Sequence, residues 1–194
     1  VNRLVSAGGA LWAITGQGLH RLQYGAWKMV SGAVLSDVCE HLGEVVVAGG
    51  NHLWQIKGDA LVSLTSAPGP FGITRVASYG ETLYVHGPGQ LTIFDGTRFG
   101  ARNVWNWPVE KLWDWGELPS LNTRDVLSLG SRLYIATDRG LGVLRGMSLT
   151  QLRGEQGLCY EDTSCLARGF GGDLWVGTTR GAIRSTGGQY HYFA

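Results

Sequence analysis

The 194-residue sequence predicts an all-β fold, a β-propeller built from about five four-stranded blades. Two observations predict it. Short apolar runs alternate with glycine-rich turns along the whole chain, which has 31 glycines and 5 prolines. The first apolar residue after a glycine hairpin recurs at Leu11, Val45, Leu83, Leu133 and Leu174. A repeat of about 40 residues is typical of four-stranded propeller blades.

The strands are predicted from the apolar runs within each repeat. These runs lie at 4–5, 11–14, 18–22 and 26–30; at 38–39, 45–47, 52–56 and 60–62; at 76–77, 83–85, 91–94 and 99; at 126–127, 133–135 and 141–144; and at 165–166, 174–176, 182–183 and 190–193. Most runs are apolar throughout and alternate only weakly. Blades stacked face to face bury both faces of a strand, so continuous apolar runs are expected.

The repeats predict blades at about residues 1–32, 33–69, 70–104, 120–156 and 157–194, which together form a single domain over residues 1–194. Each repeat begins with an inner strand and ends with an outer one. No strand is left over to pair the first blade with the last. The ring therefore closes by packing, or the chain is an arc of a larger propeller.

Composition excludes several classes of function. The net charge is +1 and no basic run is present, so no nucleic-acid partner is expected. No apolar run reaches the length of a membrane span. The chain begins at Val1, and we expect a processed form or an excised domain. No Cys/His spacing typical of zinc and no cofactor motif occurs, so neither a metal nor a cofactor is predicted.

The three cysteines are Cys39, Cys159 and Cys165, and they cannot all pair with one another. Small buried thiols are the simpler interpretation. A disulfide between Cys159 and Cys165 is the alternative, and it would indicate export.

A tryptophan-rich insertion at residues 105–119 interrupts the repeat between the third and fourth blades. It holds four of the eight tryptophans, which are Trp105, Trp107, Trp113 and Trp115. Their rings could form an aromatic platform that stacks on sugar rings or clamps a peptide. The alternative is that they pack the insertion onto the fold or against a neighbouring domain, because tryptophan is usually buried.

The last two repeats resemble the two-component regulator propeller repeat family. That family's pattern is Leu-Trp-[Ile/Val]-Gly-Thr-x-x-Gly-Leu-x-Arg, preceded by a Gly-Leu-Pro-Ser-like linker. Residues 174–184 (LWVGTTRGAIR) match it closely, residues 133–141 (LYIATDRGL) are a second copy, and residues 117–120 (ELPS) match the linker. The strong match covers about two-fifths of the chain, and the first three repeats keep only its glycine and aromatic skeleton.

The resemblance implies a β-propeller and a periplasmic or extracellular location. Members of the family commonly serve as sensor or ligand-binding regions, often for carbohydrates, and also occur beside carbohydrate-active catalytic domains. The family has no catalytic motif to transfer to this chain. No histidine-kinase segment accompanies the repeats here.

In a propeller, the loops that enter the inner strands and the turns between second and third strands share one face, which is the usual binding surface. Arg139 and Arg180 occupy equivalent turns there, with His52 and His86 near the corresponding turns of the second and third repeats. The arginines could bind a carboxylate or sulfate. The alternative is a pair of solvated turn tips.

A charged residue also enters each inner strand. The five are Arg3, Asp37, Arg75, Asp125 and Asp162. Radial repetition would bring them to the mouth of the central channel, where they could hold a polar ligand, a cation or ordered water. The alternative is a mutually neutralising ring of charges. No DxDxDG calcium loop is present.

We therefore expect a non-catalytic binding or scaffold module, attached to a catalytic or signalling domain, whose ligand is a glycan or a partner protein. Signatures such as Gly-x-Ser-x-Gly and HExxH are missing. The alternative is a polysaccharide-active lyase or hydrolase, with His86 as base and Arg75 as the neutralising group. A third interpretation is that the repeats only stack and space.

Overall fold

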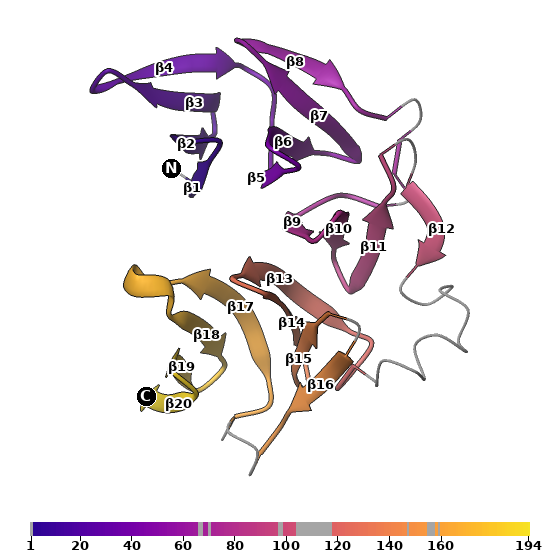
Figure 1. Ribbon diagram of the computed structural model, residues 1–194, viewed down its shortest axis with the longest axis vertical. Coiled ribbons are helices and arrows are strands. Elements are labelled where there is room, and N and C mark those ends of the chain that lie inside the picture. The colour runs from indigo at the N-terminus through magenta and orange to yellow at the C-terminus, as the bar shows by residue number, and fades with distance from the viewer. Residues whose placement is uncertain are drawn as a thin grey trace. The chain divides into compact units, whose positions relative to one another are not determined.

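The computed structural model describes residues 2–65, 68–69, 71–96, 99–103, 118–146, 148–154, 158 and 160–194, without the side chains of 100–103. These residues form five four-stranded antiparallel sheets, the blades of a β-propeller (Figure 1). Within each sheet, strands that are consecutive in the chain are neighbours. The predicted all-β fold class and the five four-stranded blades are confirmed.

The strands follow one another through glycine-rich turns. Blade one holds β1 (Arg3–Ala7), β2 (Ala10–Thr15), β3 (Gly18–Gln23) and β4 (Ala26–Ser31). Blade two holds β5 (Asp37–His41), β6 (Glu44–Gly49), β7 (His52–Lys57) and β8 (Ala60–Ser63). Blade three holds β9 (Arg75–Tyr79), β10 (Thr82–Gly87), β11 (Gln90–Phe94) and β12 (Phe99–Asn103).

The last two blades have the same order. Blade four holds β13 (Thr123–Leu129), β14 (Arg132–Thr137), β15 (Gly140–Arg145) and β16 (Ser148–Leu152). Blade five holds β17 (Thr163–Arg168), β18 (Leu174–Thr178), β19 (Gly181–Thr186) and β20 (Gln189–Phe193). A short 3-10 segment, η1 (Phe170–Gly172), joins β17 to β18.

Burial differs between the strands of one blade. The second strands β6, β10 and β14 are buried over four to five consecutive residues, so both of their faces are covered. The fourth strands β4, β8 and β20 are mostly exposed. The continuous apolar runs of these three second strands therefore mark segments that are covered on both faces.

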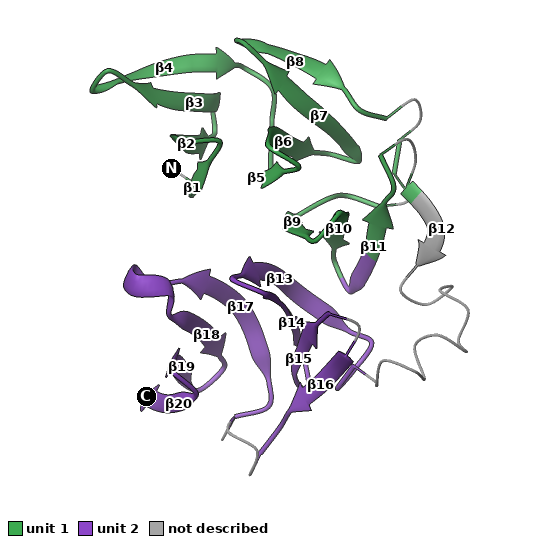
Figure 2. Cartoon of the chain, viewed as in Figure 1, with its two compact units in different colours: residues 1–88, 92–100 green, residues 89–91, 101–194 purple. Residues whose placement is uncertain are grey.

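The chain divides into two compact units (Figure 2). The first comprises residues 1–88 and 92–100, and the second comprises residues 89–91 and 101–194. The assignment of residues 1–194 to one domain stays a prediction.

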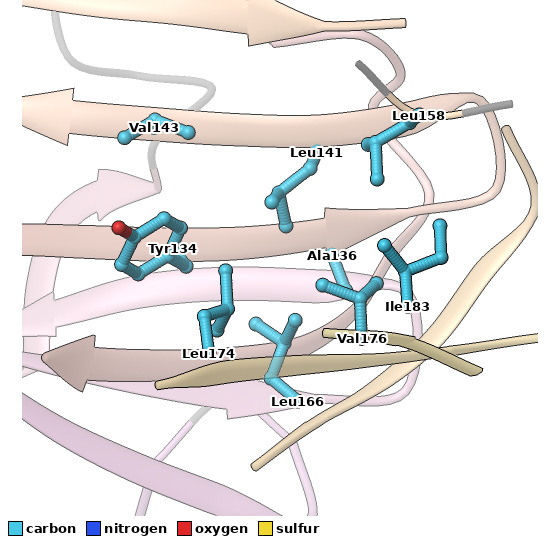
Figure 3. Packing of buried hydrophobic residues seen from close by; sticks show 9 residues of the cluster. All are labelled: Tyr134, Ala136, Leu141, Val143, Leu158, Leu166, Leu174, Val176 and Ile183. Carbon is cyan, nitrogen blue, oxygen red and sulfur yellow. The ribbon is translucent and has the colours of Figure 1, made fainter. Parts of the chain in front are cut away.

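The hydrophobic cores lie between neighbouring blades within each unit. In the first unit, one cluster includes Trp12 and Val47 from blades one and two. A second cluster joins blades two and three through Leu53 and Leu83. In the second unit, side chains of blades four and five interdigitate (Figure 3). They are Tyr134, Ala136, Leu141, Val143, Leu158, Leu166, Leu174, Val176 and Ile183.

Candidate functional site

Each sheet brings two connections to the same end, because its neighbouring strands are antiparallel. One is the loop that enters the first strand, and the other is the turn between the second and third strands. Sequence reasoning placed the binding surface at this end, and the geometry of blade five gathers polar side chains there.

A threonine shapes the turn between the second and third strands in three of the five blades. In blade five the Thr178 hydroxyl donates a hydrogen bond of 2.9 Å to the Gly181 carbonyl and accepts one of 3.2 Å from the Arg180 N–H. Thr137 makes the same two bonds in blade four, at 2.7 and 3.2 Å. The hydroxyl therefore fixes the turn and leaves the arginine side chain exposed at its tip.

A glycine ends each of these turns because of its backbone conformation. Gly140 and Gly181 have φ values of 128° and 129°. A side chain at either position would collide with the backbone of the adjoining outer strand or of the residue that follows it. The Thr-x-x-Gly pattern in the sequence therefore encodes the shape of the turn.

Thr163 holds blade five against the blade-four turn. It is completely buried, and its hydroxyl donates to the Thr137 carbonyl at 2.7 Å and to the Gly140 carbonyl at 3.1 Å. The same oxygen accepts a bond of 3.0 Å from the Thr137 N–H. This residue was not identified from the sequence, since its partners lie 23 and 26 residues away.

A hollow of about 380 Å³ lies beside the blade-five turn. It is lined by Tyr160, Glu161, Asp162, Thr179 and Arg180, and we call it the Arg180 hollow. The Arg180 guanidinium lies 5.7 Å from the centroid of the Tyr160 ring, within cation–π range. The structure thus brings together two of the predicted residues, Arg180 and Asp162.

Three residues of the Arg180 hollow were not predicted. They are Tyr160, Glu161 and Thr179. A signal for them was present, because they occupy the entering loop and the adjacent turn of one repeat. The repeat pattern singles out one charged residue in each loop, so it does not distinguish the neighbours of Asp162 and Arg180.

The Asp162 carboxylate also forms an ion pair with Arg124 of blade four, at 3.1 Å. Both side chains are more than one-third exposed, at 37% and 36%. A contact this open to water contributes little to stability, so Asp162 is available to an incoming ligand.

Arg139 does not line the Arg180 hollow. It is exposed in its own turn, next to Asp138, whose carboxylate accepts a bond of 3.1 Å from the Asn122 amide. Hydrogen bonds from Ser120 and Asn122 lower the pKa of Asp138 below its ordinary value. The two predicted arginines therefore occupy equivalent turns with different surroundings.

In the first unit, the charged residues Arg3 and Asp37 at the start of inner strands bind other parts of the fold. Asp37 is buried and forms an ion pair with Arg3. Its two carboxylate oxygens accept bonds of 2.9 Å from the N–H groups of Val38 and Val76. Burial raises the pKa of Asp37, while the charge of Arg3 and these hydrogen bonds oppose the rise.

Asp125 repeats this arrangement in the second unit. It is 3% exposed, and its carboxylate accepts bonds of 2.9 Å from the Val126 N–H and 2.8 Å from the Leu166 N–H. In blade five, the position equivalent to Asp125 is occupied by Cys165, not by Asp162. A β-bulge follows Thr123 in blade four and Thr163 in blade five, so the two strands have the same register. The predicted grouping of all five charged residues at a channel mouth stays a prediction.

The proposed catalytic pair, His86 and Arg75, consists of direct partners across β9 and β10. The His86 side chain is only 2% exposed, and its Nδ1 lies 2.9 Å from the Thr74 hydroxyl. A polymeric substrate cannot reach an imidazole buried in this way. The geometry of this pair therefore gives no support to polysaccharide cleavage.

Several predictions fall outside the described residues. Trp105, Trp107, Trp113 and Trp115 all lie there, as does Cys159. Within the described part of the chain, Cys39 and Cys165 are free thiols. The same residues include no group of three or more histidine, cysteine or carboxylate side chains arranged to hold a metal, and no helix that could cross a membrane.

Comparison with known proteins gives matches at the level of structure. No family model and no curated protein sequence matches the chain. The extracellular domain of the putative hybrid two-component system BT3049 from B. thetaiotaomicron matches all of this chain with a TM-score of 0.63 and 15% identity. The extracellular domain of the putative one-component system BT4673 from the same organism matches 99% of this chain, with a TM-score of 0.69 and 12% identity.

The chain spans 28% and 27% of the length of those two extracellular domains. The WD40 β-propeller domain of Doa1 matches 93% of the chain, over 61% of its own length, with a TM-score of 0.60 and 12% identity. At identities this low, the structural matches show a shared fold and nothing more specific. The chain is therefore a β-propeller, similar in fold to the extracellular domains of bacterial two-component and one-component systems.

Proposed function

We propose that this chain is a non-catalytic binding module of a longer protein, and that it binds a glycan in the Arg180 hollow. One observation carries the proposal. Arg180 and Asp162, selected from the sequence for different reasons, line one hollow together with the aromatic ring of Tyr160. The hollow lies at the end of blade five where propellers commonly bind ligands.

The lining of the hollow suits sugar hydroxyls. The carboxylates of Glu161 and Asp162 accept hydrogen bonds, and the Arg180 guanidinium donates them. Tyr160 offers a ring face and a phenolic hydroxyl. A volume of about 380 Å³ is within the range of small-molecule sites.

The longer protein is proposed to act outside the cytoplasm. The fold is shared with extracellular domains of putative two-component and one-component systems, and the chain spans little more than a quarter of those domains. A catalytic or signalling domain elsewhere in the same chain would use the module to locate or report its ligand. The tryptophans at 105, 107, 113 and 115 are proposed to extend the binding surface.

The test is a screen of the 194-residue chain against immobilised oligosaccharides, followed by calorimetry on those that bind. We expect Arg180→Ala and Asp162→Asn each to weaken binding by about tenfold or more, as for loss of a charge-assisted hydrogen bond. Arg168→Ala is the matched control, because Arg168 is an exposed arginine of blade five outside the hollow. Trp113→Ala and Trp115→Ala test the tryptophan extension separately.

The proposal fails if no oligosaccharide binds, or if Arg180→Ala and Arg168→Ala bind equally well. Retention of a protein ligand that requires Arg180, without any glycan, would assign the hollow to protein recognition instead. Unchanged binding by both tryptophan variants would remove the insertion from the site and leave the hollow in place.

A further inference from the structure

A second cavity lies between blades four and five, at the other end of their strands. It has a volume of about 360 Å³, and its lining includes Arg132, Arg145, Tyr134, Tyr190 and Gly188. We call it the Arg132–Arg145 groove. Leu174, which begins β18, lines the groove, whereas the turn that follows the end of β18 carries Arg180. The groove is therefore separate from the Arg180 hollow.

Two arginines line this groove from adjacent strands. Arg132 begins β14 and Arg145 ends β15, and they are the next pair along the ladder after Leu133 and Leu144. Like charges opposite one another on neighbouring strands repel. Among the described residues, no carboxylate lines the groove and neither arginine forms an ion pair.

The remaining polar lining consists of hydroxyl groups. Ser148, Thr150 and Ser185 line the groove along with the phenols of Tyr134 and Tyr190. Arg132 Nη1 donates a long hydrogen bond of 3.4 Å to the Tyr134 hydroxyl, which orients the guanidinium. All of these groups can donate hydrogen bonds to an anion.

The equivalent position in the first unit shows what the groove lacks. There, Asp59 in the turn between β7 and β8 of blade two reaches the cations of blade one. It bonds to Arg21 at 2.8 Å and to Lys28 at 2.6 Å. Asp59 is the second of the two turn residues between the paired Lys57 and Ala60, and Gly188 is the second of the two between the paired Thr186 and Gln189 of blade five. Blade five therefore presents a glycine where blade two presents a carboxylate. The cations differ in position, because Val143 and Thr150 of blade four correspond in register to Arg21 and Lys28 of blade one.

We propose that the Arg132–Arg145 groove binds an oxyanion, a carboxylate, sulfate or phosphate group carried by a small ligand. Each guanidinium can offer two parallel N–H donors, the geometry that carboxylate and phosphate groups prefer. The hydroxyl groups around them provide hydrogen bonds to the rest of the ligand, within a volume suited to a molecule of monosaccharide size.

The test is a titration of the isotope-labelled 194-residue chain, followed by NMR at constant ionic strength. The probes are sodium sulfate, sodium phosphate and sodium glucuronate, with glucose as the neutral control. We expect saturable shifts with the anions at groove residues and none with glucose. Equal affinity for all three anions indicates a site for a free oxyanion, whereas much tighter glucuronate binding indicates an acidic sugar.

Three variants make the result specific. Arg145→Gln removes one charge and should weaken anion binding by about tenfold or more. Gly188→Asp places a carboxylate in the turn and should abolish binding, because the internal charge competes with the ligand; aspartate is among the residues that tolerate the left-handed backbone of this position, where φ is 87°. Arg168→Gln removes an equivalent charge outside the groove and should bind as the unmodified chain does.

The proposal is overturned if none of the three anions gives saturable shifts in the groove. It is also overturned if Arg145→Gln binds as tightly as Arg168→Gln. The groove is independent of the Arg180 hollow, so either result leaves the glycan proposal unaffected.

Discussion

The Asp125 carboxylate in blade four accepts a hydrogen bond of 2.8 Å from the backbone N–H of Leu166 in blade five, 41 residues further along the chain. Asp37 makes the equivalent bond to Val76, 39 residues away, between blades two and three. In both cases the second oxygen accepts the N–H of the following residue. An aspartate at the start of an inner strand therefore joins its blade to the next one.

We expect Asp125→Ala to lower the free energy of unfolding by about 2–4 kcal/mol. The substitution leaves two N–H groups, those of Val126 and Leu166, without this acceptor, and each unsatisfied buried group costs about 1–3 kcal/mol. Asp162→Ala is the control, since its exposed ion pair with Arg124 is worth less than about 1 kcal/mol. Urea denaturation of both variants gives the comparison, and equal losses would contradict the structural role of Asp125.

The Thr-x-x-Gly turn of blade four makes a prediction about glycine. We expect Gly140→Ala to cost more than Gly130→Ala by at least about 1 kcal/mol, because a Cβ at residue 140 would lie 2.8 Å from the Leu152 carbonyl oxygen. Gly130 also has a positive φ, of 60°, but a Cβ there would meet nothing within 4 Å. Thermal unfolding measures the difference. Equal stability of the two variants would show that backbone conformation alone governs both positions.

Asp138 gives a prediction about pH. Hydrogen bonds from Ser120 and Asn122 lower its pKa, so the folded value lies below the ordinary 3.8. Its contribution to stability is then present above pH 3.8 and is lost as the pH falls through the folded pKa. NMR titration of the carboxyl group should show this depressed pKa, and Asn122→Ala should move it back toward 3.8. A midpoint at or above 3.8 in the unmodified chain would refute the assignment.

The two described cysteines should differ in reactivity. Cys165 is exposed, whereas burial raises the pKa of Cys39 and keeps it in the thiol form. With iodoacetamide at pH 8, we expect Cys39 to react at least about tenfold more slowly than Cys165. Peptide mass mapping after timed labelling distinguishes the sites, and Cys165→Ser provides the control. Similar rates at both positions would show that Cys39 is accessible.

The turn residues show how much of the candidate site the sequence could predict. Arg139 and Arg180 follow from the repeat, because Thr-x-x-Gly is a local pattern whose hydrogen bonds span two to three residues. The repeat indicates that Tyr160 lies in the entering loop of blade five, but not that it contacts Arg180. It precedes β17 in the chain, and its contact with Arg180 arises only when the sheet folds.

By itself, the sequence determined the blades. Glycine turns and continuous apolar runs extend over a few residues, so they can be recognised in the sequence. The second strands β6, β10 and β14 that they predict are buried on both faces. Only the tertiary structure decided how neighbouring blades meet. The same bulge follows Thr123 and Thr163, and it puts Cys165, not Asp162, at the position of Asp125. Two arginines line a groove between blades four and five, where the blade-five turn has Gly188 and the corresponding blade-two turn has Asp59. These differences depend on register and on partners about 40 residues apart, which a local pattern does not encode.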